Sequence, residues 1–464
     1  MESASALQFL KDKTILVTGA TGFLAKVFVE KILRIQPNLK KLYLLVRAED
    51  TKSAMKRFYN ELLRDTWGGN LESFILEKVV AVAGDISHVK LGIKDYELIE
   101  EMWREIDILM NFTDIAFDVN IMGALHVLNF VKKCTKINML LHTSTASGYI
   151  SERPFCSGET LIRTPKLDIT LEKNVIEEKL NQLRSTFATE TEITSTMKDL
   201  GNKRAKLYEW PNTYVFTKAV GEMVFGNSGD NMSLVIIRPT MVTSTYKEPF
   251  PGWIEGLRTI DGAIFGYGKG KLEFLLANPD TILDLIPADM VVNVMMMAMA
   301  VNVAKSSPII HQVGSSMRNP LKLSDLNEFN IRYFAKHPLM DKNGEPIKPI
   351  KVTVLKTSAI FNIYMAFRYV IPIQVFTASI TNIYIILFVI IDFNSIKFVM
   401  RLVELYKPYM LFKGITNAEK LRMAIRESSS QEVDIFNFDP MSTDWEDYII
   451  NVHIPGLVKY VLKK

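Results

Sequence analysis

Six short apolar runs between Lys13 and Pro239 constrain the fold of this chain most strongly. Each run is apolar throughout, and helix-period segments lie between the runs. Strands of this kind are buried on both faces, as in a parallel sheet covered by helices. The runs are Thr14–Val17, Leu42–Val46, Val79–Val82, Ile106–Met110, Met139–Leu141 and Leu234–Ile237. They predict an α/β fold built on a Rossmann-type doubly wound parallel sheet.

Two segments suggest how the chain is divided. A long insert at about 152–211 separates the fifth and sixth runs, and its helical stretch 167–184 is charged on most faces, which is typical of a solvated cap. Residues 342–351 have the composition of a linker. We therefore expect a large domain over 1–345 and a smaller, mainly helical C-terminal domain over 350–464.

Composition excludes several classes of protein. The 464 residues contain 55 Lys+Arg and 51 Asp+Glu without a basic run, so nucleic acid is not an expected partner. Cys134 and Cys156 are too few for a disulfide framework, and the six histidines lack metal-ligand spacing, so we expect no metal. From the residues at the N-terminus we expect neither a secretory signal nor a transit peptide. Nothing in the pattern defines an oligomeric state.

One stretch explains much of the positive mean hydropathy of +0.11. Residues 369–391 carry no charge over 23 positions, whereas a transmembrane helix needs about 20 residues. Pro372, Gln374 and Asn382 weaken its first half for insertion. A membrane-inserted or interfacial segment and a buried helix both agree with this composition.

A glycine-rich loop follows the first run. Gly19 permits a tight turn, Gly22 lets the backbone approach a diphosphate, and the following helix offers N–H groups to the anion. The arrangement of strand, glycine loop and helix predicts a dinucleotide site. Its expected binding residues are Thr18, Gly19, Thr21, Gly22, Phe23 and Leu24.

The ends of the second and third runs indicate which dinucleotide binds. Arg47 follows the second run where a carboxylate would select NAD, and a guanidinium there binds the 2′-phosphate of NADPH. The alternative for Arg47 is a solvated surface charge. Asp85 and Ile86 follow the third run, where Asp85 either reaches the adenine amino group or caps the next turn. NADPH is the expected cofactor.

Tyr214 and Lys218 are spaced to lie on one face of a helix. A phenol with a pKa of about 10 donates a proton poorly near neutrality unless a cation stabilises the phenolate, and Lys218 supplies that charge. At the end of the fifth run, Thr145 offers a hydroxyl to a substrate carbonyl, with Ser144 as the alternative. Together these residues form a candidate catalytic set.

These motifs resemble those of extended short-chain dehydrogenase/reductases and, more closely, those of plant alcohol-forming fatty acyl-CoA reductases. The similarity covers nearly the whole chain. Besides the glycine loop and the Tyr214/Lys218 pair, it rests on His142–Ala146, Pro249–Ile254, Ile286–Asn293, Val313–Ser316, Arg318–Pro320, Phe436–Asp439, Trp445, Tyr448 and His453–Tyr460. The segments near the end of the chain are the more specific ones.

The resemblance implies that 1–345 is an NAD(P)-binding reductase domain and that 350–464 is the family's C-terminal domain. It implies reduction of a long-chain acyl-CoA by NADPH, in two steps through a bound aldehyde, to a primary alcohol for wax biosynthesis. Tyr214 would donate the proton, Lys218 would assist it and bind the nicotinamide ribose, and Thr145 or Ser144 would hold the carbonyl oxygen. Together with the 369–391 stretch, it favours membrane association at the cytosolic face of the endoplasmic reticulum.

One departure from the family pattern raises alternatives. In the family, the loop that corresponds to 111–120 passes beneath the cofactor. Compared with the family pattern, this loop is shorter here by roughly ten residues. We expect folding and NADPH binding to persist. A catalytically weak or inactive NADPH-binding paralogue is one alternative function, and an extended reductase for a different carbonyl substrate is another.

Overall fold

The computed structural model describes most of the chain. The described ranges are 5–63, 77–112, 117–146, 167–226, 232–272, 274–303, 305, 307–348, 352–371 and 430–462. Predictions for 372–391, for 113–116 in the shortened loop, for 152–166 in the insert and for Cys156 lie outside these ranges. Those predictions remain predictions.

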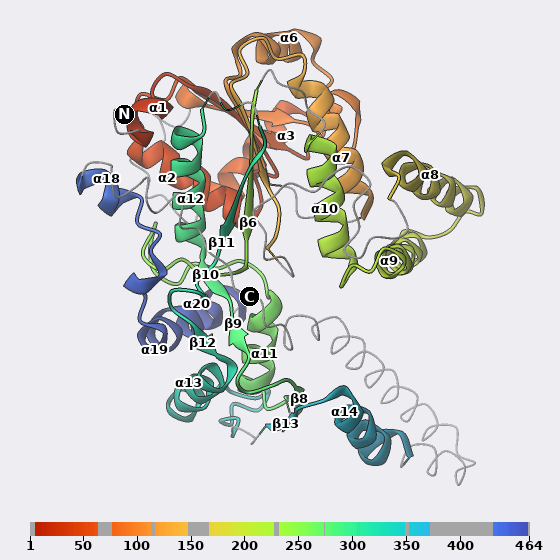
Figure 1. Ribbon diagram of the computed structural model, residues 1–464, viewed down its shortest axis with the longest axis vertical. Helices are drawn as coiled ribbons and strands as arrows, with labels where there is room; N and C mark the ends of the chain where they lie inside the picture. Colours follow the sequence, from red (N-terminus) through yellow and green to blue (C-terminus); the bar gives the residue numbers. More distant parts are fainter. Residues whose placement is uncertain are drawn as a thin grey trace.

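A parallel sheet of seven strands organises the fold (Figure 1). Its order is β11-β6-β5-β4-β1-β2-β3, and every neighbouring pair is parallel. The strands are β1 (Thr14–Thr18), β2 (Lys41–Val46), β3 (Val79–Ala83), β4 (Ile108–Asn111), β5 (Met139–Thr143), β6 (Ser233–Pro239) and β11 (Ile309–Val313). The order in which the chain adds strands to the sheet reverses between β1 and β4. Open α/β sheets bind ligands at such a point. The predicted doubly wound sheet and its six strands are confirmed.

The seventh strand, β11, is missing from the prediction for a clear reason. Its sequence contains His311 and Gln312, which interrupt the apolar run. Both side chains are buried, and His311 Nε2 lies 3.0 Å from the Asn302 side-chain nitrogen. A local partner therefore contacts one ring nitrogen of a polar residue that sequence reasoning treats as evidence against a buried strand.

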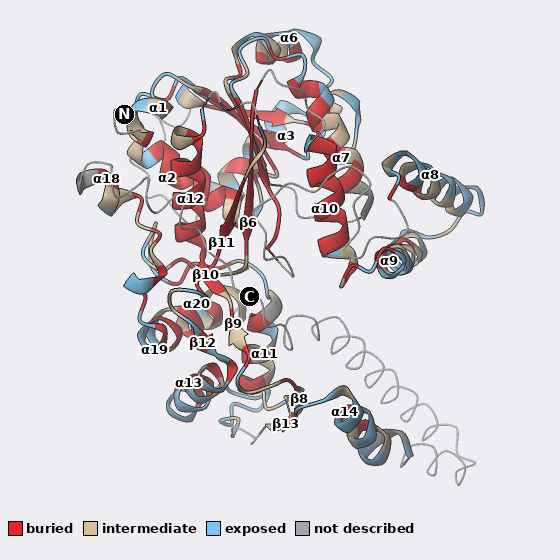
Figure 2. Ribbon diagram, in the orientation of Figure 1, coloured by how far each residue is buried: buried red, intermediate tan, exposed pale blue. Residues whose placement is uncertain are grey.

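Helices cover both faces of the sheet, and Figure 2 shows their inner sides as part of the buried core. One face carries α1 (Ala6–Leu10), α2 (Phe23–Ile35), α3 (Thr51–Phe58) and α12 (Ala288–Val301). The other carries α6 (Tyr96–Glu105), α7 (Phe117–Val131) and α10 (Thr213–Gly226). Residues of α10 are buried from Val215 to Phe225, so its register against the sheet is tightly fixed.

The described part of the insert is a helical hairpin. It contains α8 (Ile169–Ser185), which confirms the predicted helical stretch, and α9 (Glu190–Leu207), which the sequence does not predict. Glu172 is fully buried between them and accepts hydrogen bonds from Arg204 Nε at 2.8 Å and Tyr208 OH at 2.6 Å. The hairpin is otherwise largely exposed (Figure 2).

A group of short strands and helices follows β6 in the chain. Three two-stranded sheets are formed by β7 (Met241–Thr243) with β10 (Leu285–Pro287), β9 (Ile282–Leu283) with β12 (Leu321–Lys322), and β8 (Phe274–Leu276) with β13 (Thr353–Leu355). Their helices are α11 (Thr259–Gly268), α13 (Leu323–Lys336) and α14 (Ser358–Met365). No described helix combines the length and the apolar character needed to cross a bilayer.

The described C-terminal segment is helical, as predicted. It comprises α18 (Ser430–Ile435), α19 (Trp445–Asp447), α20 (Ile454–Leu457) and the helical turns Pro440–Ser442, Tyr448–His453 and Val458–Leu462. Phe436 and Phe438 are buried with α2 and α12, while Tyr448 and Leu457 are buried with α11 and α13. This segment therefore contributes to two hydrophobic cores formed with the first domain.

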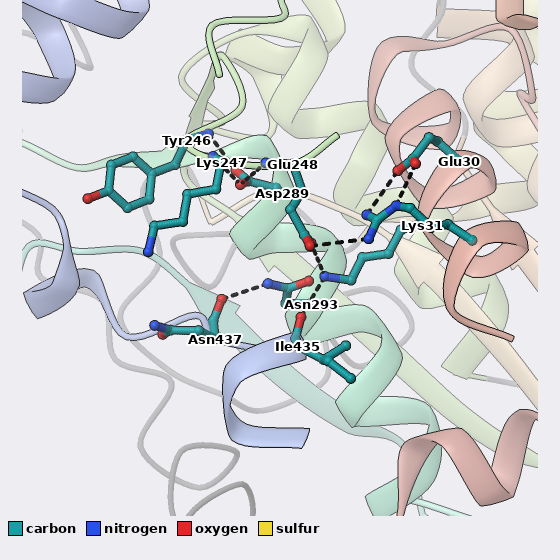
Figure 3. A network of polar contacts seen from close by, with 10 residues as sticks. Glu30, Lys31, Tyr246, Lys247, Glu248, Asp289, Asn293, Ile435 and Asn437 are labelled. Atoms are coloured by element: carbon teal, nitrogen blue, oxygen red, sulfur yellow. Dashed lines mark hydrogen bonds and ion pairs between the residues drawn. The ribbon is translucent and has the colours of Figure 1, made fainter. Parts of the chain in front are cut away.

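A buried polar network also joins this segment to α2 (Figure 3). The Lys31 side chain is 1% exposed and donates to the Glu248 carboxylate and to the Ile435 carbonyl, the latter at 2.6 Å. Burial lowers the pKa of Lys31, although Glu248 opposes the shift. Nearby, Asn293 Nδ2 donates to the Asn437 carbonyl at 2.6 Å. Polar side chains of α2 and α12 thus bind the backbone of the C-terminal segment.

Candidate active site

The glycine loop has the geometry of an anion-binding turn. Gly19 has φ +67°, and a Cβ there would lie 2.5 Å from the Phe112 carbonyl oxygen. Gly22 is the N-cap residue that precedes α2, is exposed and donates its N–H to the Gly19 carbonyl at 2.9 Å. No side-chain hydrogen bond caps this helix start, so its first N–H groups can bind a diphosphate. The geometry of the loop fits a dinucleotide, and the contacts predicted for its individual residues remain predictions.

The other predicted loop residues have distinct surroundings. Thr18 is buried, and its hydroxyl donates to Asn111 Oδ1 at 2.7 Å, which joins β1 to β4 at the carboxyl edge of the sheet. Thr21 and Leu24 are partly buried in the loop and the first turn of α2. Phe23 is buried against Trp253, with ring centres 5.5 Å apart.

The tip of β2 brings two arginines together. Arg47 is exposed immediately after β2, and its carbonyl accepts a hydrogen bond from Arg57 Nη1 at 2.6 Å. Asp50 Oδ1 accepts from the Ser53 N–H at 2.7 Å, which lowers the pKa of Asp50 and caps α3. The carboxylate of Asp50 thus caps the helix, while the Arg57 guanidinium lies beside the strand tip and also pairs with Glu61 at 2.9 Å. Sequence reasoning missed Arg57 because it lies on the next helix.

Asp85 and Ile86 lie at the end of β3. Asp85 Oδ1 accepts from the Ser87 N–H at 2.9 Å, which is the turn-capping alternative. Contact of Asp85 with adenine remains a prediction. Ile86 packs against α7, where a Cβ on Gly123 would lie 2.7 Å from Ile86 Cδ1. Its carbonyl lies 2.8 Å from His126 Nδ1.

Helix α10 presents the predicted tyrosine and lysine beside β5. Tyr214 is 40% exposed, whereas Lys218 is buried one turn further on. Lys218 Nζ donates to the Thr143 carbonyl at 3.0 Å and lies 5.8 Å from the centre of the Tyr214 ring. Burial of the ammonium strengthens its field at the phenol. The exposed phenol next to a buried cation suits proton donation to a ligand.

Ser144 and Thr145 follow β5 and are buried. The Ser144 N–H bonds to the Ile237 carbonyl at 2.7 Å, and the Ala146 N–H bonds to the Pro239 carbonyl at 2.9 Å. The backbone carrying both hydroxyls is therefore fixed to β6. The Lys218 bond to the preceding residue of β5 brings the candidate catalytic residues to one end of the sheet.

Sequence reasoning also missed Asn120 on α7. Its Nδ2 donates to Thr217 Oγ1 at 3.0 Å, and this hydroxyl donates to the Tyr214 carbonyl at 3.0 Å. Asn120 therefore fixes the turn of α10 that carries Tyr214 and Lys218. A buried asparagine within an apolar helix was the available signal, but its partner became evident only from the fold.

Three buried polar atoms near Lys218 make no hydrogen bond within the described part of the chain. Asn120 Oδ1, His142 Nε2 and Thr143 Oγ1 have no hydrogen-bond partner among the described residues. His142 Nδ1 lies 3.1 Å from Asn111 Nδ2. Because native proteins rarely leave such atoms unpaired, they indicate a place for water or a polar ligand. This observation also fits cofactor binding at the carboxyl edge of the sheet.

Neither thiol nor metal chemistry is indicated by the described residues. Cys134 is buried, its thiol lies 3.6 Å from the Phe130 carbonyl, and burial raises its pKa to about 12. It is therefore a packed thiol and not a nucleophile at neutral pH. Within the described ranges, no group of three or more His, Cys, Asp and Glu side chains could hold a metal ion.

The sheet, the glycine loop at its switch point and the Tyr214/Lys218 pair define a nicotinamide-dependent oxidoreductase of the short-chain dehydrogenase/reductase type. Two family models described as "Male sterility protein" match residues 17–295, as an NAD-binding domain, and residues 391–464. The chain belongs to this family, within its fatty acyl-CoA reductases.

Curated relatives are similar over the full length. The "Probable fatty acyl-CoA reductase 4" of Arabidopsis thaliana is 50% identical and covers 99% of this chain and 100% of its own. "Fatty acyl-CoA reductase 1" of the same plant is 50% identical with full coverage of both. The "Alcohol-forming fatty acyl-CoA reductase" of Simmondsia chinensis is 45% identical over 99% of each chain.

Solved structures support the fold. The terminal reductase domain of the myxalamid biosynthetic pathway superposes with a TM-score of 0.58 at 15% identity, covering 97% of this chain and 91% of that one. A reductase domain of a nonribosomal peptide synthetase from Mycobacterium tuberculosis gives 0.54 at 16% identity, with coverage of 98% and 94%.

Proposed function

We propose that this protein reduces a long-chain acyl-CoA with NADPH to a primary alcohol, in two steps through a bound aldehyde. The observation that carries the proposal is the placement of Tyr214 and buried Lys218 beside the end of β5, at the sheet edge that carries the glycine loop. Family membership supplies the substrate class. The reaction consumes two NADPH and two protons and releases free CoA.

The residues have separate tasks in each step. The nicotinamide, when bound, supplies the hydride. Thr145, or Ser144, holds the carbonyl oxygen by a hydrogen bond. In the first step the carbon–sulfur bond breaks and the thiolate of CoA leaves, which forms the aldehyde. In the second step Tyr214 gives its proton to the developing alkoxide, and Lys218 stabilises the phenolate that remains.

Arg47 and Arg57 support a preference for NADPH. The Arg57 guanidinium lies beside the β2 tip, where a 2′-phosphate would sit, and is held by its bond to the Arg47 carbonyl and by an ion pair with Glu61 at 2.9 Å. Arg47 is the exposed residue that follows β2. Replacing Arg57 with methionine should raise the KM for NADPH about tenfold or more without changing the KM for NADH. An equal change for both cofactors would contradict this assignment.

The test of function is product formation. Purified protein is incubated with palmitoyl-CoA and NADPH, and alcohol, aldehyde and free CoA are quantified beside a Tyr214→Phe variant. We expect alcohol and a rate about 10²–10⁴-fold lower in the variant. NADPH binding, measured by fluorescence, should be similar in both proteins. Wild-type product no greater than that of Tyr214→Phe would favour the non-catalytic alternative, and aldehyde alone would restrict the reaction to its first step.

Two observations argue against the alternatives. Tyr214, Lys218 and Thr145 are all present at one end of the sheet, which does not favour a non-catalytic paralogue. The similarity to fatty acyl-CoA reductases extends over the full chain, which does not favour a different carbonyl substrate. The shortened loop remains the reason to measure turnover directly.

We also infer association with the cytosolic face of the endoplasmic reticulum membrane, where the alcohol would enter wax biosynthesis. Supporting it, α14 and the turn after it expose Ile360, Ile363, Phe367 and Ile371, spaced three or four residues apart. The opposite side of α14 is packed through Phe361. The uncharged stretch of sequence to 391 follows immediately.

Basic residues accompany this apolar face, as expected of a protein that binds an anionic lipid surface. Lys356 precedes the exposed apolar residues, Arg368 lies between Phe367 and Ile371, and both basic residues are exposed. The double variant Ile363→Ser/Phe367→Ser should reduce flotation with vesicles containing phosphatidylserine, whereas Val89→Ser, at another exposed apolar position, should not. Unchanged flotation would remove this face from the proposal.

A further inference from the structure

We propose that Arg258 binds the diphosphate of the dinucleotide and that the C-terminal helices hold it in place. The inference rests on dinucleotide binding by the family and does not depend on the identity of the carbonyl substrate. It concerns residues 252–258, which we call the strap. The strap lies between the first turn of α2 and the C-terminal segment.

Three contacts place the strap against the start of α2. Trp253 meets the edge of Phe23, with ring centres 5.5 Å apart. Glu255 accepts from Lys26 Nζ through both carboxylate oxygens at 2.9 Å. The Arg258 guanidinium carbon lies 5.8 Å from the centre of the Phe23 ring. Since Phe23 is the first residue of α2, Arg258 lies beside the helix end that binds anions.

The chemistry of these side chains favours Arg258 as the phosphate ligand. Lys26, the cation in the first turn of α2, is buried and directed to Glu255, whereas Arg258 Nε donates to the Glu255 carbonyl at 3.5 Å. Arg258 is only partly buried and rests over an aromatic ring. A guanidinium held in this way keeps its planar set of donors oriented, which suits the paired oxygens of a diphosphate.

The C-terminal segment fixes the same arginine from its other side. Asp261, in the first turn of α11, accepts the Arg258 backbone N–H through Oδ2 at 3.1 Å. Its Oδ1 lies 3.0 Å from His453 Nε2, and both side chains are almost fully buried. His453 Nδ1 in turn lies 3.1 Å from Ser244 Oγ. Because a carboxylate only accepts, His453 Nε2 donates to Asp261, while Nδ1 accepts the Ser244 backbone N–H at 3.4 Å.

Close backbone packing adds a second support for the strap. A Cβ on Gly252 would lie 2.7 Å from the Val452 carbonyl oxygen, and one on Gly456 would lie 1.9 Å from the Gly252 carbonyl oxygen. Only glycine fits at this approach. The strap therefore cannot shift independently of the C-terminal segment, and His453 is a positioning residue for Arg258.

The first experiment measures cofactor affinity in the full-length protein. Arg258→Met is compared with Arg332→Met, a substitution of an exposed arginine that pairs with Glu446. Titration calorimetry gives Kd for NADPH and NADH, and steady-state assays give KM for palmitoyl-CoA. We expect Arg258→Met to raise both cofactor Kd values about tenfold to a hundredfold and by the same factor, because the diphosphate is common to both. Arg332→Met should leave them unchanged.

Three results would overturn the assignment. Unchanged cofactor Kd values for Arg258→Met would remove Arg258 from the dinucleotide site. A higher KM for palmitoyl-CoA with unchanged cofactor affinity would assign the arginine to the diphosphate of CoA instead. Because binding is measured without turnover, an inactive protein would still give an answer. Loss of NADPH affinity alone would place Arg258 at the 2′-phosphate.

The second experiment tests the role of His453. His453→Gln should raise the Kd for NADPH, and it should add nothing further when combined with Arg258→Met, because the histidine acts through the arginine. Asp261→Asn serves as a second variant if His453→Gln does not fold. Thermal unfolding is recorded for each. Additive effects of His453→Gln and Arg258→Met on Kd would assign the histidine a structural role only.

Discussion

His142 shows how strongly surroundings determine the state of a single residue. It is buried on β5, with Nδ1 3.1 Å from Asn111 Nδ2. Burial, assisted by the charge of Lys218, holds its pKa well below the usual 6.5. The amide nitrogen of Asn111 can only donate, so Nδ1 accepts and the neutral ring carries its hydrogen on Nε2. A protonated ring would lose this bond and face Lys218.

This state predicts a pH-dependent stability. The unfolded chain takes up a proton at His142 below pH 6.5 and the native state does not, so the free energy of unfolding falls as pH falls, by at most about 1.4 kcal/mol per unit. His142→Gln should reduce this slope between pH 7.5 and 5.5 in urea titrations. His88→Gln, at an exposed position, should keep the wild-type slope. Equal slopes in all three proteins would contradict the prediction.

Gly19 is the residue where backbone geometry leaves no alternative. Gly19→Ala should destabilise the protein by more than about 1–2 kcal/mol, the cost of a left-handed conformation alone, because its Cβ would also meet the Phe112 carbonyl at 2.5 Å. Gly344→Ala is the matched control, with φ +83° and no atom within 4 Å. Urea unfolding should give the larger loss for Gly19→Ala. Similar losses would show that the close approach costs nothing.

Sequence reasoning reached the residues whose neighbours are local. Tyr214 and Lys218 are one helical turn apart, and Gly19 and Gly22 lie in one loop, so spacing alone placed them. It could not reach Asn120, Arg57 or Arg258, because each acts on residues brought close only by tertiary structure. It left two functions open for Asp85, of which the structure shows the turn cap.

At the scale of elements, the position of α10 depends on one buried ion pair. Arg238 on β6 donates to Glu222 on α10, through Nε at 3.0 Å and Nη2 at 2.5 Å, and both side chains are at most 1% exposed. The pair lies one turn beyond Lys218 on the same helix. It therefore fixes the catalytic helix to the sheet.

Removing one partner of this pair should be costly. Glu222→Gln leaves a buried arginine without its counter-charge, and we expect a loss of about 3–5 kcal/mol in the free energy of unfolding. The double variant Glu222→Leu/Arg238→Met should lose less than the single variant, because no isolated charge remains. Glu177→Gln breaks an exposed pair with Lys173 and should cost under about 0.5 kcal/mol. A double variant less stable than Glu222→Gln would contradict this account.

The elements that sequence reasoning found and missed differ in what defines them. The six predicted strands are continuously apolar, which is a local property. The short strands β7, β8, β9, β10, β12 and β13 have two or three residues each, and only their partners define them. The helix α9 was missed because its many charged residues obscure the apolar pattern of one face. That face carries Met197 and Ala205, which are buried in a hydrophobic cluster.

At the scale of the whole molecule, the C-terminal segment and the first domain share cores. Phe436 is fully buried among residues of α2 and α12, and Lys31 of α2 bonds the Ile435 carbonyl (Figure 3). The contacts with α2 join residues about 400 positions apart, so no local pattern could predict them. The predicted division at 345–350 remains a prediction, and the described residues beyond 430 contribute to the stability of the domain that carries the active site.

This shared packing predicts that one methyl group near the end of the chain will weaken cofactor binding. In Gly456→Ala the new Cβ would lie 1.9 Å from the Gly252 carbonyl oxygen, so the strap and α20 must move apart. We expect a loss of at least about 1–3 kcal/mol in the free energy of unfolding, together with a higher Kd for NADPH because Arg258 is displaced. Urea unfolding and titration calorimetry measure the two effects.

Gly262→Ala is the matched control for this substitution. Both glycines are helical, but a Cβ on Gly262 of α11 meets no atom within 4 Å. Alanine should therefore stabilise that helix by up to about 1 kcal/mol and leave the Kd for NADPH unchanged. If Gly456→Ala lowered stability while cofactor affinity stayed at the wild-type value, the C-terminal segment would stabilise the fold without positioning the strap. Loss of both properties in Gly456→Ala alone would link the end of the chain to the dinucleotide site.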